Sequence, residues 1–205
     1  MSKLLLVRHG TTTLNDVKRF WGKTDVELSP EGVNQAERLR DRLSGEKIDA
    51  IYASNLCRAR TTAKIIASKH RLGITTRDEL AEINFGWVEG LTFDEITTQY
   101  PELSKELKDW KAKARFPGGE SLDELDCRLQ IFLEFIKKHK PEETVLVVAH
   151  FGTLRLIVCN LLGIGLEHWL QIRIEPCSLS IMETFPQGAI LSLLNDVSHL
   201  STKEP

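Results

Sequence analysis

Leu4-Leu5-Leu6-Val7, followed at once by Arg8-His9-Gly10, is the stretch that decides the fold. Four apolar residues in a row are typical of a strand that is buried on both faces in a parallel sheet. A second run of this kind, residues 145–149, ends at His150. Ligands of parallel sheets bind beyond the carboxyl ends of the strands, so we expect both histidines at a ligand-binding face.

Strand and helix patterns alternate along the chain. Ser29-Pro30-Glu31 combines an N-cap, a proline at the first helical position and an acidic first turn, and it predicts a helix that ends near Gly45. Residues 48–53 are predicted as the next strand, and Ser54 or Asn55 as the cap of the helix after it. The same criteria predict a helix after the Ser121 capping box, a helix over 152–162, and a hairpin of strands 178–185 and 189–194.

This order of elements predicts an α/β fold with three layers, α/β/α, around a doubly wound, mostly parallel sheet with an antiparallel edge. A length of 205 residues fits one domain, 1–205. Between about residues 85 and 120, glycines and prolines interrupt short helical patterns. We interpret that segment as a short helical lid insertion.

The composition excludes several function classes. With 27 Lys and Arg against 29 Asp and Glu, the net charge of −2 gives no global field that would attract nucleic acid or an anionic membrane. The most apolar stretch, residues 154–166, is too short to span a bilayer and contains Arg155 and Asn160. No signal peptide is recognisable, and the four cysteines form no C-x-x-C pair, so we expect a cytoplasmic protein. The oligomeric state is not indicated.

Several polar residues near the strand ends suit anion chemistry. Arg8 can donate two hydrogen bonds to a phosphate, and a neutral His9 can direct a ring nitrogen at phosphorus. Arg58 lies in the first turn of a predicted helix, where a cation is unfavourable unless an anion is near. Glu82 is the one acid in a mostly apolar window, which favours a general acid. Each residue also has an ordinary interpretation: a surface arginine, a loop or core histidine, or a solvated carboxylate.

Six motifs occur in a fixed order between about residues 3 and 160. They are Leu5-Leu6-Val7-Arg8-His9-Gly10, Gly22-x-x-Asp25-x-x-Leu28-Ser29-x-x-Gly32, Ser54-x-x-x-Arg58-Ala59-x-x-Thr62-Ala63, Glu82 with Gly86-Trp87-x-x-Gly90, Pro117-Gly118-Gly119-Glu120-Ser121, and Val148-Ala149-His150. Taken together, the chain resembles the histidine phosphatase superfamily, the phosphoglycerate-mutase-like group.

The resemblance implies a phosphohistidine mechanism with no metal and no cofactor. It implies that His9 attacks phosphorus, that Glu82 protonates the leaving oxygen, and that a protonated His150 helps to neutralise the phosphoryl oxygens. The implied catalytic set is His9, Glu82 and His150, and the implied phosphate-binding set is Arg8, Asn15, Arg58 and the backbone N–H of Phe151.

The substrate predicted from the resemblance is a small phosphorylated metabolite. Cofactor-dependent mutases of this family carry a longer, arginine-rich insert. The corresponding segment here, residues 92–116, is short and has Arg115 as its single arginine, so hydrolysis is favoured over transfer. The size and the Pro-Gly-Gly-Glu-Ser motif are most similar to α-ribazole phosphatases of cobalamin biosynthesis. Trp21 would then stack on a planar base or pack under a loop. The alternatives are a broad-specificity or sugar-phosphate phosphatase, a phosphoglycerate mutase, and a non-catalytic module that binds a phosphorylated ligand.

Phe151 is a departure from the family pattern, which often has glycine after the second histidine. Thr11-Thr12-Thr13 and Leu14 depart from it as well. We expect the Phe151 side chain to narrow the mouth of the pocket and to affect the choice of substrate more than the chemistry.

Overall fold

The computed structural model describes residues 2–14, 19–108 and 115–201. Within these ranges the chain forms a six-stranded sheet in the order β3-β2-β4-β1-β5-β6. β3, β2, β4 and β1 run parallel, and β5 and β6 run antiparallel at one edge, which confirms the expected sheet. The strands are β1 Ser2–Arg8, β2 Ala50–Ser54, β3 Ile74–Arg77, β4 Thr144–Ala149, β5 Leu179–Phe185 and β6 Gly188–Asp196.

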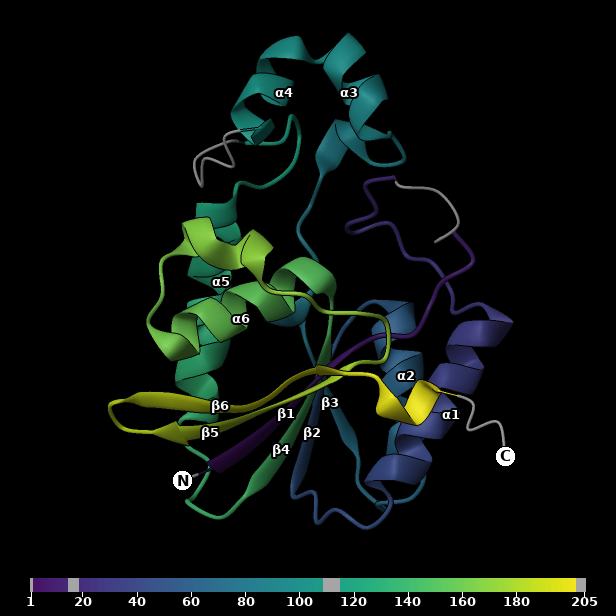
Figure 1. Ribbon diagram of the computed structural model, residues 1–205, viewed down its shortest axis with the longest axis vertical. Helices are drawn as coiled ribbons and strands as arrows, with labels where there is room; N and C mark the ends of the chain where they lie inside the picture. The colour runs from purple at the N-terminus through teal and green to yellow at the C-terminus, as the bar shows by residue number, and fades with distance from the viewer. Residues whose placement is uncertain (1, 15–18, 109–114, 202–205) are drawn as a thin grey trace.

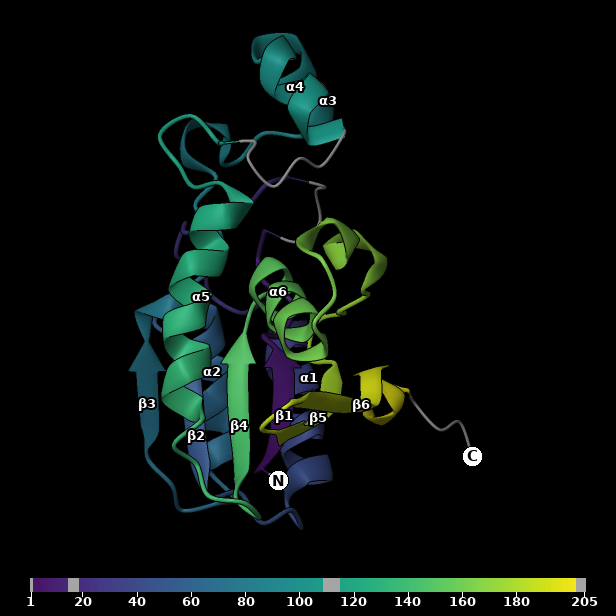
Figure 2. The ribbon, with the colours of Figure 1, turned by 90° about the vertical axis from the view of Figure 1, so that its left-hand side faces the viewer.

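Helices cover both faces of the sheet, and the three expected layers are confirmed (Figure 2). One face packs against α1 (Pro30–Leu43) and α2 (Cys57–Ala67), and the other against α5 (Leu122–Ile136) and α6 (Phe151–Leu162). Two further helices, α3 (Phe93–Gln99) and α4 (Pro101–Lys108), come between β3 and α5. Short 3-10 turns are η1 Asp78–Leu80, η2 Gly86–Val88, η3 Leu166–Gln171 and η4 Ser198–Leu200.

The central strands are buried on both faces, as their continuous apolar runs predict. In β1, Leu4 and Leu6 pack on the α5/α6 side, whereas Leu5 and Val7 pack on the α1/α2 side. β4 divides its side chains in the same way, because successive residues of a strand point to opposite faces. The alternation therefore also determines on which side of the sheet the polar residues after these strands lie.

Helix starts are partly as predicted. The hydroxyl of Ser29 accepts a hydrogen bond from the N–H of Gly32, and Ser121 forms a capping box with Glu124. The expectation that Ser54 or Asn55 caps α2 is wrong, because the N-cap is Leu56 and its side chain makes no capping bond. A carboxylate oxygen of Asp25, distant in sequence, accepts the N–H of Cys57 at 2.6 Å instead. The edge strand β3, with the sequence Ile-Thr-Thr-Arg, was not expected.

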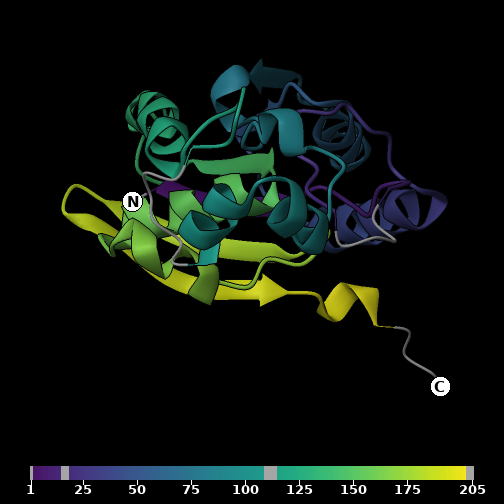
Figure 3. The ribbon, with the colours of Figure 1, turned by 90° about the horizontal axis from the view of Figure 1, so that it is seen from above.

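α3 and α4 stand beyond the carboxyl ends of the parallel strands (Figure 1). Seen from above, they lie over that end of the sheet (Figure 3). The expected ligand-binding face is therefore the one beneath these two helices. Among the described residues, no helix has both the length and the apolarity that crossing a bilayer requires.

Candidate active site

Two adjacent strands bring the two histidines together. β1 pairs with β4 in parallel, with Arg8 opposite Ala149, so both strands end at the same level. The N–H of His9 donates to the carbonyl of Ala149 at 3.0 Å. The rings of His9 and His150 lie 5.0 Å apart between centroids. Sheet register alone thus places residues 141 positions apart side by side, as the strand ends predict.

The His9 ring is held in one tautomer. Its Nδ1 lies 2.7 Å from the carbonyl oxygen of Gly10, and a carbonyl can only accept, so Nδ1 carries the hydrogen. Burial lowers the pKa of His9 well below its usual value, and the charges of Arg58 and Arg8 lower it further. His9 is therefore neutral, and the lone pair on Nε2 is available as a nucleophile.

A close backbone contact fixes the loop that carries the Gly10 carbonyl. A side-chain carbon at Gly10 would come within 2.4 Å of the carbonyl oxygen of Gly32, at the start of α1. The N–H of Gly10 also donates to the hydroxyl of Thr62 on α2, at 3.2 Å. The acceptor for His9 is thus anchored from both helices of the α1/α2 face.

His150 is buried and neutral in this structure. Its Nδ1 accepts a hydrogen bond from Nε of Arg58 at 3.2 Å, and its Nε2 lies 2.7 Å from the hydroxyl of Ser54. Because arginine can only donate, Nδ1 of His150 carries no hydrogen. Burial is the main cause of a pKa of His150 well below its usual value, and the charges nearby act in the same direction. The arrangement differs from the expected protonated His150.

Arg58 is 3% exposed, and each nitrogen of its guanidinium has a partner. Besides His150, it donates through Nη1 to the carbonyl of Thr24 at 2.8 Å and through Nη2 to that of Gly22 at 2.6 Å. Burial lowers the pKa of Arg58, and three carboxylates oppose this effect: Glu82, Asp25 and Glu89. These anions explain how a cation is tolerated in the first turn of a helix.

Glu82 occupies the N-terminus of α6. One carboxylate oxygen accepts the N–H of Gly152 at 3.0 Å, and the other accepts those of Thr153 at 3.2 Å and Ile83 at 3.0 Å. The expected apolar setting is therefore wrong, because backbone N–H groups surround the carboxylate. Unpaired N–H groups and the positive end of the helix dipole are a favourable site for an anion.

Arg128 on α5 was missed by the sequence analysis. It donates to the main-chain carbonyls of Glu82 at 2.9 Å and Glu79 at 2.7 Å, and it pairs with Glu120 at 3.0 Å. The carboxylate of Glu120 also accepts the N–H of Asn84 at 2.8 Å. These contacts hold the backbone on both sides of Glu82. They go through main-chain groups, which no side-chain motif reveals.

The guanidinium groups of two arginines lie over the Phe151 ring. The guanidinium of Arg8 lies 5.1 Å from the ring centroid and that of Arg155 lies 3.5 Å from it, both within the range of cation–π attraction. Arg8 also donates to the carbonyl of Ile174 at 2.8 Å. Arg155 was noted in the sequence only as a break in an apolar run. It is 7% exposed, and burial lowers its pKa to about 10.

The described part of the chain thus brings together His9, His150, Arg58, Arg8, Phe151 and Glu82, whose charge acts on both Arg8 and Arg58. Asn15, the remaining predicted phosphate ligand, lies outside the described residues.

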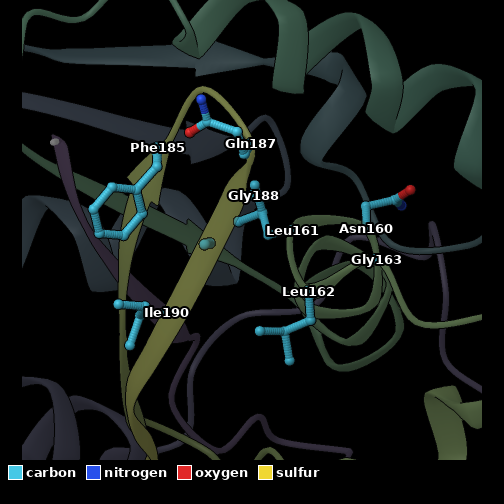
Figure 4. Close-up of a pocket in the computed structure, with 9 residues that line it drawn as sticks. Asn160, Leu161, Leu162, Gly163, Phe185, Gln187, Gly188 and Ile190 are labelled. Atoms are coloured by element: carbon cyan, nitrogen blue, oxygen red, sulfur yellow. The ribbon is translucent and has the colours of Figure 1, made fainter.

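A cavity of about 430 Å³ lies away from this site, between the carboxyl end of α6 and the β5–β6 turn (Figure 4). No lining residue is titratable: Asn160, Leu161, Leu162, Gly163, Phe185, Gln187, Gly188, Ala189 and Ile190.

Comparison with known proteins shows the family of the chain. A model of the histidine phosphatase superfamily, branch 1, matches residues 4–197. The chain belongs to the histidine phosphatase superfamily. Its family relatives include phosphoserine phosphatase 1 of Hydrogenobacter thermophilus, which is 35% identical over 98% of this chain and 95% of its own length. A probable phosphoglycerate mutase, GpmB, of Photorhabdus laumondii is 31% identical over 98% and 96%.

Among solved structures of the superfamily, a putative α-ribazole-5′-phosphate phosphatase from Escherichia coli matches with a TM-score of 0.89 and 27% identity. The match covers 96% of this chain and 97% of that one. The names of these relatives thus differ in the activity they give, whereas the fold is shared with the solved structure.

The buried neutral histidines make stability depend on pH. In the unfolded chain each histidine gains a proton as the pH falls below about 6.5, whereas folded His9 and His150 stay neutral. The unfolded state then binds more protons, so we expect the free energy of unfolding to fall by up to about 1.4 kcal/mol per pH unit for each of them. Urea unfolding between pH 7.5 and 5.5 measures this slope.

His150→Gln should reduce that slope by one histidine's contribution, whatever its effect on stability at pH 7.5. The matched control is His168→Gln, since His168 is exposed and outside the site. An unchanged slope in His150→Gln would contradict the assignment of His150 as neutral.

Proposed function

We propose that the protein is a metal-independent phosphomonoesterase that hydrolyses a small phosphorylated metabolite through a phosphohistidine on His9. The observation that carries the proposal is the hydrogen bond from Nδ1 of His9 to the carbonyl of Gly10, which leaves Nε2 unprotonated beside Arg58 and Arg8. A nucleophile whose tautomer is fixed needs no general base of its own.

In the first step, Nε2 of His9 attacks phosphorus, and the bond from phosphorus to the ester oxygen breaks. Glu82 gives its proton to that oxygen, so an alcohol leaves and Glu82 becomes a carboxylate. The imidazole keeps the hydrogen on Nδ1, which donates to the Gly10 carbonyl throughout. Arg8 and Arg58 balance the charge that spreads over the phosphoryl oxygens, which is where most of the catalysis of phosphoryl transfer arises.

In the second step, water attacks the phosphohistidine while Glu82 takes its proton. The N–P bond breaks, its electron pair returns to Nε2, and inorganic phosphate leaves. The N–H groups of Gly152 and Thr153 accommodate the Glu82 carboxylate that the first step produces. Once it has taken the proton from water, Glu82 is able to donate again, and the next cycle starts.

The proposal includes no metal and no cofactor. Arginines can supply the positive charge that metal ions provide in other phosphoryl-transfer enzymes. Within the described ranges, no three His, Cys, Asp or Glu side chains converge as metal ligands would. We also treat the chain as one domain, 1–205, in which the segment of residues 85–120 with α3 and α4 acts as the lid.

Two substrate classes have support. The match to a putative α-ribazole-5′-phosphate phosphatase favours α-ribazole 5′-phosphate, which we retain as the first choice. The 35% identity to phosphoserine phosphatase 1 favours phosphoserine. The indole of Trp21 lies against Gly90, where an added side-chain carbon would come within 3.2 Å of the ring, and this supports packing rather than base stacking.

Phosphate release from p-nitrophenyl phosphate in EDTA is the first test, followed by labelling of the enzyme. We expect turnover in the chelator and acid-labile phosphate on the wild-type protein, and no label on His9→Ala, because alanine lacks the Nε2 that we propose as the nucleophile. His168→Ala, which alters an exposed histidine, should retain the label. Loss of activity in EDTA contradicts metal independence, and label on His9→Ala contradicts the nucleophile.

Glu82→Gln separates proton donation from binding. We expect turnover of alkyl phosphates to slow by about 10² to 10⁴, the usual contribution of general acid–base catalysis. Aryl phosphates should lose much less, because their leaving oxygens need little protonation. An equal loss on both ester types in steady-state kinetics would show that Glu82 does not act as the acid.

A substrate panel distinguishes the remaining candidates. We expect α-ribazole 5′-phosphate or phosphoserine to be hydrolysed with a kcat/KM at least about tenfold above p-nitrophenyl phosphate, because specificity uses contacts beyond the phosphoryl group. Strong stimulation of phosphoglycerate isomerisation by a bisphosphorylated sugar acid would instead indicate the mutase. Phosphate binding without any turnover would indicate the binding module.

A further inference from the structure

Residues 22–25 form a loop that contacts Arg58, and of these four residues only Gly22 is buried. The side chains of Lys23, Thr24 and Asp25 are exposed. The carbonyls of Gly22 and Thr24 nevertheless accept the two terminal nitrogens of the Arg58 guanidinium, at 2.6 and 2.8 Å. The orientation of a buried catalytic cation therefore depends on a loop that polar contacts must keep in place.

Asp25 makes one such contact, with the N–H of Cys57 on α2, and the carboxylate of Glu89 makes three more. One of its oxygens accepts the N–H of Lys23 at 2.7 Å, and the other accepts the N–H of Thr24 at 2.8 Å and the Thr24 hydroxyl. Gly22 fits closely between Glu89 and the backbone after Glu82: an added side-chain carbon would come within 2.8 Å of the Glu89 carboxylate and 2.0 Å of the Ile83 carbonyl. The loop is thus clamped on the side opposite Arg58.

One peptide group connects the two charges directly. The Gly22–Lys23 peptide accepts from Nη2 of Arg58 through its oxygen and donates to Glu89 through its N–H. Its dipole is aligned between a cation and an anion, and hydrogen bonds in such a series strengthen one another. The charge of Glu89 also acts on Arg58 through space.

We propose that Glu89 is a positioning residue for phosphoryl binding, which orients the Arg58 guanidinium through the Gly22–Lys23 peptide and through Thr24, whose N–H and hydroxyl it accepts and whose carbonyl accepts from Arg58. It touches neither the substrate nor Arg58 in this account. The role rests on the proposed function, because it assigns Arg58 to the phosphoryl oxygens. Position 89 requires a carboxylate, because all three of its partners act as donors. An amide would offer one acceptor oxygen, and its NH₂ group would face a backbone N–H.

Glu89→Gln is the test, with the inhibition constant of inorganic phosphate as the readout. We expect that constant to rise by about 10- to 100-fold, the effect of losing one or two charge-assisted hydrogen bonds. The kcat/KM values of aryl and alkyl phosphates should fall by the same factor, because proton donation by Glu82 is untouched. A greater loss on alkyl esters than on aryl esters would overturn the assignment.

Glu95→Gln is the matched control in the same part of the chain. Glu95 also accepts a backbone N–H, that of Thr92 at 2.7 Å, and it pairs with Arg19, but it does not contact the 22–25 loop. We expect its phosphate inhibition constant to stay within about twofold of wild type, since it perturbs the cap of α3 and the ion pair with Arg19 and not the 22–25 loop. An effect as large as that of Glu89→Gln would show that lost carboxylates in this segment act nonspecifically.

A double-mutant cycle with Arg58→Gln decides whether Glu89 acts through Arg58. If it does, adding Glu89→Gln to Arg58→Gln should weaken phosphate binding no further, whereas independent effects would multiply. Multiplication of the two effects overturns the proposal. If Glu89→Gln does not fold, judged by circular dichroism, the same cycle is run with Glu89→Asp, which keeps the charge on a shorter side chain.

Failure of the inference and failure of the proposed function are distinguishable. If the wild-type protein does not hydrolyse any ester, calorimetric binding of inorganic phosphate replaces the inhibition constant, and the cycle still tests the coupling of Glu89 and Arg58. If hydrolysis is normal and the cycle is additive, the phosphohistidine mechanism stands and the role of Glu89 is refuted.

Discussion

The burial of one positive charge beside two imidazoles is the constraint on which the rest of the site depends. Arg58 is almost inaccessible to water, and it donates to Nδ1 of His150. Burial of the two imidazoles is the main cause of their lowered pKa values, and the charge of Arg58, in a medium that screens it poorly, lowers them further, so both histidines are held neutral. Neutrality is what the proposed role of His9 as nucleophile requires, and the pairing of β1 with β4 is what places His9 next to His150.

The charges around the site do not cancel by direct pairing. Arg8, Arg58 and Arg155 are all cations of lowered pKa, and burial is the first cause in each case. Arg58 is satisfied by carbonyl oxygens and an imidazole, Arg8 donates to a carbonyl, and both Arg8 and Arg155 lie on the Phe151 ring. Dipoles and aromatic faces offset desolvation without neutralising the charge, so the field remains available to an incoming phosphate dianion.

Periodicity predicted the parts of the molecule in which local pattern and tertiary setting agree. The runs at 4–7 and 145–149 are buried on both faces, and the register that follows places His9 against His150. β3 was not predicted because it is an edge strand with one apolar residue, Ile74. The cap of α2 was predicted wrongly because Asp25, in a loop distant in sequence, accepts the N–H of Cys57.

The least predictable contributions to the site pass through the backbone. Arg128 donates to main-chain carbonyls, and Glu89 accepts main-chain N–H groups. Every residue type has these groups, so the sequence does not indicate which residues are the partners. The motif pattern indicated the residues to which we assign the chemistry, such as Glu82 and Arg58, whereas the residues that support them depend on where loops cross. The apolar window around Glu82 was misleading for the same reason, since its polar partners are the main-chain N–H groups of α6.

The start of α6 illustrates how the fold separates two kinds of anion. A helix N-terminus is a ready phosphate site, yet here Gly152 and Thr153 donate to the carboxylate of Glu82. In the proposed mechanism, phosphate is bound by the side-chain cations Arg8 and Arg58 instead. The two N–H groups at the start of α6 fix the position of the Glu82 carboxylate, which is the proposed acid. Under that proposal, backbone donors position the acid and arginines bind the substrate.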